Sequence, residues 1–295
     1  MSRLVHVGQV VVDVLLRLPE LPGPGGDVLA TDSRIAVGGG LTVLSTAVRQ
    51  GLPAAYAGMH GTGPMADLAR EALRGAGAEL LQPRYPGEDT GFTVVMVESD
   101  GERTFATSVG AEGELGPAEL ARLALRPDDF VYVSGLCLVQ PRNGPALAEW
   151  LSTVDVPVIV DPGPLVADIP ADVLDPVLAR ADWWSCNESE GILLTGEAEP
   201  AAALAARTGG VIVRMGPEGC VLAADGEVRW IPGYPVKAFG SSGDVHVGAF
   251  AAALAAGESP EASVARANAV AALTLTRHGA APAAEEVDAF LAAQH

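Results

Sequence analysis

The stretch Phe239-Gly240-Ser241-Ser242-Gly243-Asp244 joins a strand-like run at 227–231 to a long alanine-rich helical pattern that begins near Asp244. Small residues at such a junction let backbone N–H groups approach an anion at the start of a helix. An aspartate beside a bound phosphate is well placed to deprotonate an alcohol. The stretch therefore indicates a phosphoryl-transfer site, while an ordinary loop with a helix N-cap explains it equally well in isolation.

The composition is that of an acidic globular protein. The chain has 295 residues, of which 49% are hydrophobic, so it can bury a large core without disulfides. Its 37 acidic and 18 basic residues give a formal net charge of −19, which disfavours nucleic acid and anionic membranes as partners. An anionic nucleotide would need local compensation from backbone amides, a few arginines and a metal ion.

The cysteines and the N-terminus predict a cytoplasmic protein. Cys137, Cys186 and Cys220 are odd in number and far apart, and they match neither a zinc spacing nor a Cys-x-x-Cys pair, so we expect core thiols in a reducing compartment. The first residues lack the long apolar region of a signal peptide, and no apolar stretch reaches membrane-spanning length.

Strand-like and helical segments alternate along the chain. Expected strands lie at 4–18, 54–59, 130–133, 158–160, 183–186 and 211–214, and expected helices at 41–50, 65–74, 145–152, 170–180, 200–208, 244–256, 260–277 and 284–293. This alternation predicts an α/β fold with three layers, in which helices cover both faces of a mostly parallel sheet.

Two hairpin signatures interrupt the alternation. Runs at 93–97 and 103–107 flank Ser99-Asp100-Gly101-Glu102, and runs at 220–223 and 227–231 flank Asp225-Gly226. The Pro/Gly-rich stretch at 19–26 is expected to be a loop or edge strand. We therefore expect one domain over 1–295, with a small β lid contributed by segments near 10–38 and 90–108.

Polar motifs follow three of the predicted buried strands, where open α/β sheets place their ligands: Asp161-Pro162-Gly163, Asn187-Glu188-Ser189-Glu190 and Gly216-Pro217-Glu218-Gly219. Asn187 and Glu190 can share one face of a first helical turn and offer oxygen ligands to hydrated Mg²⁺. Alternatively, Asn187 is a helix N-cap and Glu190 completes a capping box, which by itself is the favoured interpretation.

A second group of residues near the N-terminus suggests an acceptor site. Asp13 interrupts an apolar strand, either to bind hydroxyl groups or because the strand leaves the sheet there. Gly38-Gly39-Gly40 lets backbone approach a small ligand closely, although a tight turn explains three glycines nearly as well. Together with Arg103 of the first hairpin, these residues would shape a polar pocket under the lid.

Other nucleotide-binding patterns are absent from the sequence. No Gly-x-x-x-x-Gly-Lys-Ser/Thr loop is present, and no Gly-x-Gly-x-x-Gly opens a helix after the first strand, which argues against P-loop NTPases and dinucleotide-dependent dehydrogenases. The five histidines are scattered without metal spacing, and we expect most of them to be structural or exposed, with His246 notable only for following Asp244 by two residues.

Taken together, these motifs resemble the ribokinase-like PfkB carbohydrate kinase family over nearly the whole chain. The matching positions are Gly8 with Asp13, Gly38-Gly39-Gly40, Thr90-Gly91, Asp161-Pro162, Asn187-x-x-Glu190, Gly216-x-x-Gly219, Gly243-Asp244 and Ala267-Asn268-Ala269. The resemblance implies an α/β core with a β-sheet lid. It also implies transfer of the γ-phosphoryl group of ATP to a hydroxyl of a sugar, nucleoside or related small alcohol.

The resemblance also implies roles for individual residues. Asp244 would be the catalytic base, beside an anion hole formed by the amides of Ser242 and Gly243, and Ser241 would be a further catalytic residue. Asn187 and Glu190 would organise Mg²⁺. The acceptor would be bound by Asp13, Gly38, Gly39, Gly40, Thr42 and Arg103, and the nucleotide by Asn187, Arg214, Gly216, Gly219, Asn268 and Gly279.

The chain departs from the family pattern at several positions. The family signature Asp-Thr-x-Gly-Ala-Gly-Asp begins here with Ala238, and Ser241 replaces its first glycine, so activation by the monovalent cation K⁺ is doubtful. Family asparagines near the acceptor appear as Val11, Thr42 and Glu112, so specificity for ribose is not carried over.

The leading hypothesis is therefore an ATP- and Mg²⁺-dependent kinase for a small sugar. One alternative is a nucleoside kinase of the same fold, but an aromatic content of only 5% favours a sugar over a nucleobase. Another is a non-catalytic sugar- or nucleotide-binding regulatory homologue, against which the base and the metal motif together argue. The exposed face of the lid hairpin further suggests a homodimer through the lid.

Overall fold

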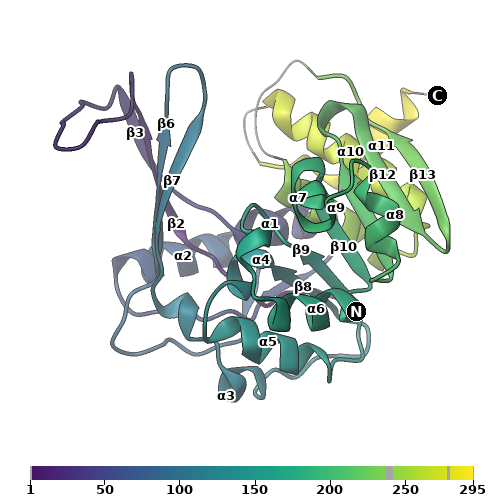
Figure 1. The fold of residues 1–295 in the computed structure, drawn as a ribbon, viewed down its shortest axis with the longest axis horizontal. Helices are drawn as coiled ribbons and strands as arrows, with labels where there is room; N and C mark the ends of the chain where they lie inside the picture. Colours follow the sequence, from purple (N-terminus) through teal and green to yellow (C-terminus); the bar gives the residue numbers. More distant parts are fainter. Residues whose placement is uncertain (1, 237–241, 278–279, 295) are drawn as a thin grey trace.

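The larger of two sheets forms the centre of the molecule, and the computed structural model describes residues 2–236, 242–277 and 280–294 (Figure 1). Within these residues it has nine strands in the order β13-β12-β11-β10-β9-β8-β1-β4-β5. Their bounds in chain order are β1 Leu4–His6, β4 Ala54–Tyr56, β5 Glu79–Leu80, β8 Phe130–Ser134, β9 Val158–Asp161, β10 Trp183–Asn187, β11 Gly210–Arg214, β12 Gly219–Ala224 and β13 Glu227–Pro232. All pairs are parallel except those that join β12 to its two neighbours.

Helices cover both faces of this sheet, because side chains along its strands are apolar on each side. In β8, Val131 and Val133 belong to one buried cluster and Tyr132 belongs to the other. The first cluster is completed by α3 Pro117–Leu120, α4 Gly135–Leu138, α5 Asn143–Leu151, α6 Ala171–Arg180, α7 Glu188–Thr195 and α8 Pro200–Ala205. The second is completed by α1 Gly40–Arg49, α2 Pro64–Gly75, α9 Gly243–Ala255, α10 Pro260–Arg277 and α11 Ala284–Ala292. The expected three-layer α/β fold is confirmed.

The smaller sheet has four strands in the order β3-β2-β6-β7, with bounds β2 Val12–Arg17, β3 Asp32–Val37, β6 Phe92–Val97 and β7 Arg103–Ser108. β2 runs parallel to β6 and antiparallel to β3, and β6 is antiparallel to β7. Figure 1 shows this sheet standing out from the body at the upper left, with α10, β12 and β13 on the right. The segments named as a lid from the sequence therefore supply all of its strands.

Most elements lie close to their expected bounds, and the differences have simple causes. The hairpin about Asp225-Gly226 is present, and both residues have the positive φ angles, 53° and 78°, that a two-residue turn requires. The expected strand at 4–18 is divided between the two sheets, because β1 ends at His6 and β2 begins at Val12. The short elements α3, α4 and β5 were not predicted, since two to four residues carry no periodic signal.

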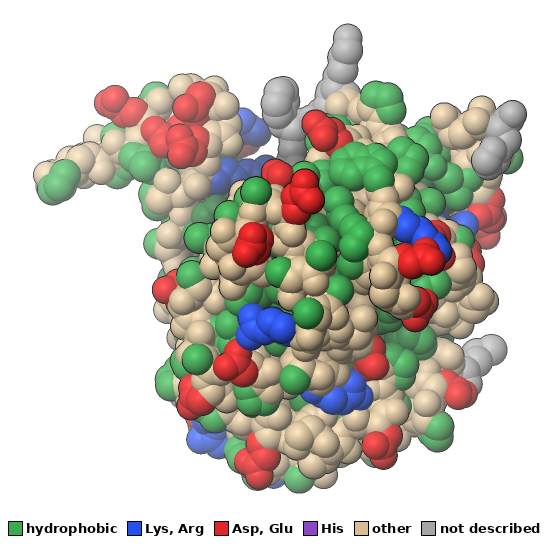
Figure 2. All heavy atoms as spheres, turned by 45° about the vertical axis from the view of Figure 1, so that its right-hand side comes forward, with side chains coloured by type: hydrophobic (Ala, Val, Ile, Leu, Met, Phe, Trp, Pro, Cys, Tyr) green, Lys and Arg blue, Asp and Glu red, His purple; other side chains and the backbone are tan. Residues whose placement is uncertain are grey.

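The surface agrees with the acidic composition. Acidic side chains are scattered over the face shown in Figure 2, among fewer basic ones. In the part of the chain that the structure describes, no helix is both long enough and apolar enough to cross a bilayer.

Candidate active site

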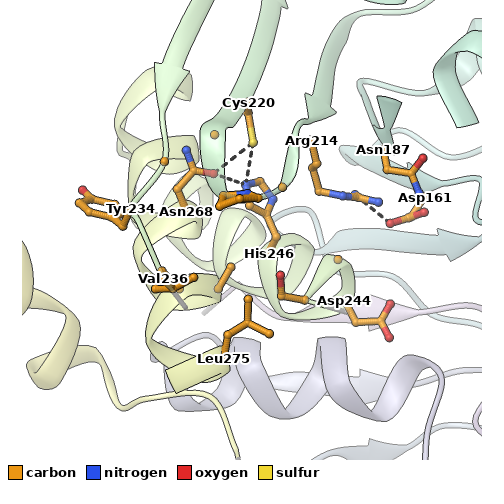
Figure 3. Close-up of a pocket in the computed structure, with 18 of the residues that line it drawn as sticks. Asp161, Asn187, Arg214, Cys220, Tyr234, Val236, Asp244, His246, Asn268 and Leu275 are labelled. Atoms are coloured by element: carbon orange, nitrogen blue, oxygen red, sulfur yellow. Dashed lines mark hydrogen bonds and ion pairs between the residues drawn. The ribbon is translucent and has the colours of Figure 1, made fainter. Parts of the chain in front are cut away.

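A cavity of about 470 Å³ opens where the carboxyl ends of β9, β10 and β11 meet the N-terminus of α9 (Figure 3). Parallel sheets place their ligands at this edge. The cavity gathers most of the residues predicted for phosphoryl transfer and nucleotide binding: Asn187, Glu190, Arg214, Gly216, Gly219, Ser242, Gly243, Asp244 and Asn268. Two other predicted residues, Ser241 and Gly279, lie outside the described residues.

Helix α9 begins at Gly243 and carries Asp244 in its first turn. The N–H groups of a first turn have no intrahelical acceptor, and the helix dipole adds positive potential there. Gly243 lies close to Arg214, since a Cβ added to it would stand 3.3 Å from the Nη2 atom. The N–H of His246 donates to the carbonyl of Ser242 at 2.9 Å and closes the turn. The turn thus presents backbone amides beside a carboxylate, an arrangement that can bind an anion.

The pKa of Asp244 is raised to about 7, mainly by burial and next by the charge of Asp161, while Arg214 lowers it. Asp13 and Glu190 add smaller upward contributions. At neutral pH this carboxyl is therefore near its midpoint, which suits a group that accepts a proton during a reaction. The contribution of Asp13 also shows that the smaller sheet brings its carboxylate into the electrostatic neighbourhood of Asp244.

Arg214 is held by several partners at the end of β11. Its Nη1 atom lies 2.9 Å from Asp161 Oδ2 and donates to Ser185 Oγ at 2.5 Å, and its Nη2 atom lies 3.8 Å from Glu190 Oε2. Burial acts to lower the pKa of the guanidinium, but Asp161 and Glu190 outweigh it and raise that pKa. The sequence analysis predicted Asp161 at the end of a strand but did not name it as a site residue. In the structure it is the main partner of Arg214.

Asn187 and Glu190 form a capping box at the start of α7. Asn187 Oδ1 accepts the N–H of Glu190, and Glu190 Oε2 accepts the N–H of Asn187, both at 2.8 Å. The capping interpretation therefore describes the geometry. Glu190 Oε1 accepts no hydrogen bond from the described residues, and Glu190 lines the cavity, so one carboxylate oxygen is left for a ligand.

The glycines of the loop after β11 are required by its backbone. Gly216 and Gly219 have φ angles of 61° and 123°, a range that residues with a side chain rarely adopt. A Cβ on Gly219 would also lie 2.2 Å from the carbonyl oxygen of Ile231. This loop forms one wall of the cavity.

The three N-terminal glycines are likewise explained by close approaches within the protein. A Cβ on Gly38 would lie 2.1 Å from Asp13 Oδ2, and one on Gly40 would lie 2.0 Å from the ring of His6. Gly39 has a positive φ of 60°. Burial raises the pKa of Asp13, while Arg34 lowers it. The structure therefore brings the predicted acceptor carboxylate and the glycine turn together.

Thr42 and Arg103 differ in their relation to this turn. Thr42 lies in the first turn of α1, where its N–H donates to Gly39 O at 3.1 Å. Arg103 is exposed at the far end of β7. Asp13 is level with Thr93 and Thr107 across the sheet, and Arg103 is four residues further along, or about 13 Å at the usual rise per residue. The structure does not bring Arg103 to the acceptor turn.

The side-chain bonds of Asn268 were not anticipated from the sequence. Its amide is bonded to Cys220, to His246 and to two backbone carbonyls, so its polar atoms are already paired within the protein. His246 also lines the cavity. In the sequence it was notable only for following Asp244 by two residues. Among the described residues, no group of three or more His, Cys, Asp or Glu side chains forms a metal site.

Comparisons with known proteins point to one family. A family model for pfkB family carbohydrate kinases matches residues 1–287. The chain is 31% identical to an uncharacterized sugar kinase of Escherichia coli (strain K12), covering 95% of this chain and 91% of that relative. It is 30% identical to an ATP-dependent ribose-1-phosphate kinase of Halopiger xanaduensis, covering 99% and 98% of the two chains. A solved structure of Arabidopsis thaliana ribokinase complexed with ribose and ATP is 25% identical, with a TM-score of 0.80 and 99% of each chain covered.

Proposed function

Because the chain belongs to the pfkB family of carbohydrate kinases, and is therefore a sugar kinase, we propose that Asp244 is the general base of its ATP-dependent phosphorylation of a small sugar. One observation carries the proposal: Asp244 is held in the first turn of α9, beside the cavity, with a pKa of about 7. A base with such a pKa can take the proton of an acceptor hydroxyl as the phosphoryl group arrives.

The amides of Ser242 and Gly243 are proposed to stabilise charge on the transferring phosphoryl group. Phosphoryl transfer depends on positioning and charge neutralisation more than on covalent chemistry. The start of α9 supplies unpaired N–H groups and the positive end of a helix dipole at the same place. Arg214 adds a nearby cation, although Asp161 neutralises much of its charge.

The proposed Mg²⁺ site is the Asn187–Glu190 pair. Mg²⁺ usually keeps several waters and is bound by one or two carboxylates together with substrate phosphates, so a single available oxygen of Glu190 fits its preference. When bound with ATP, the ion would neutralise charge on the phosphate groups. The capping box holds Glu190 in place, and this is the contribution of Asn187.

The proposed acceptor site is Asp13 with Gly38, Gly39, Gly40 and Thr42, and the smaller sheet is proposed to act as a lid over it. A carboxylate can accept hydrogen bonds from sugar hydroxyls. Closing a lid excludes water, which would otherwise compete as acceptor. Arg103 is left out of this site because of its place at the far end of β7.

The proposal is tested by measuring ADP release with MgATP across pentoses, hexoses, ketoses, ribose 1-phosphate and nucleosides. Asp244→Ala protein serves as the blank. We expect turnover on a sugar that is absent from the blank. Turnover only on nucleosides would replace the acceptor class, and unchanged turnover in the blank would remove Asp244 from its role. If no acceptor gives ADP release while ATP binding is still measurable by calorimetry, the result would favour a non-catalytic binding protein.

Two further properties belong to the same proposal. We place the protein in the cytoplasm, where ATP is supplied. We also propose a homodimer through the lid, because β3 and β7 are edge strands that carry exposed apolar side chains.

A further inference from the structure

Three buried side chains from three different elements meet in the wall of the cavity (Figure 3). They are Cys220 of β12, His246 of α9 and Asn268 of α10, which are 1%, 3% and 6% exposed. His246 Nε2 lies 3.2 Å from Asn268 Oδ1 and 3.4 Å from Cys220 Sγ, and Cys220 Sγ donates to Asn268 Oδ1 at 3.1 Å. The mechanism proposed above uses none of these bonds.

The orientation of the Asn268 amide follows from its surroundings. Its Nδ2 atom lies 3.1 Å from the carbonyl oxygen of Pro232 and 3.4 Å from that of Ile231, at the end of β13. Carbonyl oxygens only accept hydrogen bonds, so the amide nitrogen must face them. The amide oxygen, which also only accepts, therefore faces His246 and Cys220.

This orientation fixes the proton of His246. Two lone pairs would face each other if Nε2 were bare, so the imidazole carries its proton on Nε2 and donates it to Asn268 Oδ1. Burial lowers the pKa of His246 to about 3 and raises that of Cys220 to about 12, so both groups are neutral. Nδ1 of His246 is then a shielded acceptor, and it has no hydrogen-bond partner among the described residues.

We propose that His246 is a positioning residue for phosphoryl transfer, whose Nε2–H bond to Asn268 ties the first turn of α9 to the nucleotide wall of the cavity, which is the part formed by Gly216, Gly219 and Asn268. His246 lies in the same turn as Asp244, and its backbone N–H bonds to Ser242 O. Asn268 in turn holds the end of β13, which leads to Gly233 in the cavity lining. This bond thus links the turn that carries the base to the nucleotide wall. This inference rests on the role proposed for Asp244.

A positioning role for His246 can be told apart from a role in stability, because its buried Nδ1 atom has no hydrogen-bond partner among the described residues. A buried acceptor without a donor destabilises the folded state, and an apolar side chain at position 246 would avoid that cost. Asn268 would still accept the Cys220 thiol after such a change. A variant at this position should therefore lose activity without a matching loss of stability.

The test compares His246→Gln, whose amide nitrogen can replace Nε2, with His246→Asn and His246→Leu, which place no donor there. We expect kcat to fall about tenfold or more in the Asn and Leu variants, with KM for the sugar within about threefold, and kcat to remain within about threefold of wild type in His246→Gln. The matched control is Thr46→Val. Thr46 is buried on α1 against Gly248 of α9, and its hydroxyl has no partner among the described residues, so this variant should keep full activity.

Melting temperatures and histidine spectra complete the test. Equal kcat in all three His246 variants would overturn the proposal, as would a loss of kcat that follows the melting temperature. Long-range ¹H–¹⁵N spectra of histidine-labelled protein should show His246 neutral and protonated on Nε2 from pH 5 to pH 8, and an Nδ1–H signal would contradict the assigned bond. This measurement needs no turnover, so it separates failure of the inference from failure of the proposed base.

Discussion

At the level of single residues, the site depends on the charges gathered around Asp244. Asp161, Asp13 and Glu190 raise the pKa of this carboxyl, and Arg214 lowers it. Such clusters shift pKa values into the range that proton transfer needs. The identity of Asp244 as a candidate base was readable from its motif, but its pKa depends on neighbours that lie far away in the sequence.

The first prediction concerns the pH dependence of catalysis. Asp244 must be ionised to act as a base, so kcat/KM should rise with pH through about 7. The charge of Asp161 raises the pKa of Asp244. The Asp161→Asn variant should therefore have a lower pKa at Asp244, and its kcat/KM should begin to rise at a lower pH. The measurement is kcat/KM from pH 5 to pH 9 for both proteins. An unchanged or higher pH for this rise in Asp161→Asn would contradict the assignment.

The same carboxyl should make the protein less stable at alkaline pH. In the unfolded chain an aspartate ionises near its usual value of about 4, whereas Asp244 in the folded state ionises near 7. Between these values the folded state binds more protons, so its stability falls as pH rises through this window. We expect Asp244→Asn to melt above wild type at pH 8 and close to it at pH 4. Asp27→Asn removes an exposed carboxylate and is the control. It should leave the difference between the melting temperatures at pH 4 and pH 8 as it is in the wild type.

At the level of elements, two connections of the smaller sheet are held by one buried carboxylate. Glu112 is 1% exposed, and its two oxygens accept the N–H groups of Gly91, before β6, and Gly110, after β7, at 2.8 and 3.0 Å. Hydrogen bonds to an ionised acceptor are stronger than neutral ones. Glu112, which stands where the resemblance predicts an asparagine, therefore holds two of the chain segments that join the lid to the body.

Glu112→Gln tests this connection. The amide group turns one acceptor into a donor that faces an N–H group, so we expect a loss of about 1–3 kcal/mol in the free energy of unfolding, together with a higher KM for the sugar. Urea denaturation and acceptor kinetics measure the two effects. Glu114→Gln is the control, because Glu114 belongs to the same short turn but pairs with the half-exposed Arg142 at 3.3 Å, and should cost less than about 1 kcal/mol. Equal losses in the two variants would refute the argument.

What the sequence could predict at this level depended on the range of the interaction. The turn at Asp225-Gly226 and the end of α1 before Gly51 are local and were predicted correctly. Asn268 forms hydrogen bonds with residues that lie 22 to 48 positions away in the sequence, and no local sequence pattern predicts such bonds. Arg103 was placed with the acceptor residues because it belongs to the lid hairpin, but the strand register decides which end of the hairpin it occupies.

At the level of the whole molecule, a small sheet whose edge strands are β3 and β7 stands out from a large body. Proteins usually protect such edges, because an unpaired strand can pair with another chain. β3 and β7 carry Ile35 and Phe105, which are 61% and 60% exposed. These features are why we expect the proposed homodimer to form through this sheet and not through the body.

Light scattering at micromolar concentration tests the dimer, and the expected mass is twice that of one chain. Ile35→Lys and Phe105→Lys should reduce the mass to that of a monomer. Trp230→Lys is the matched control, because Trp230 is 49% exposed on β13, an edge strand of the other sheet, and should leave the dimer intact. Each chain carries a formal charge of −19, so salt should strengthen the association by screening the repulsion between copies. A monomeric wild-type mass at both low and high salt would exclude the dimer, and an effect of Trp230→Lys alone would move the interface to the body.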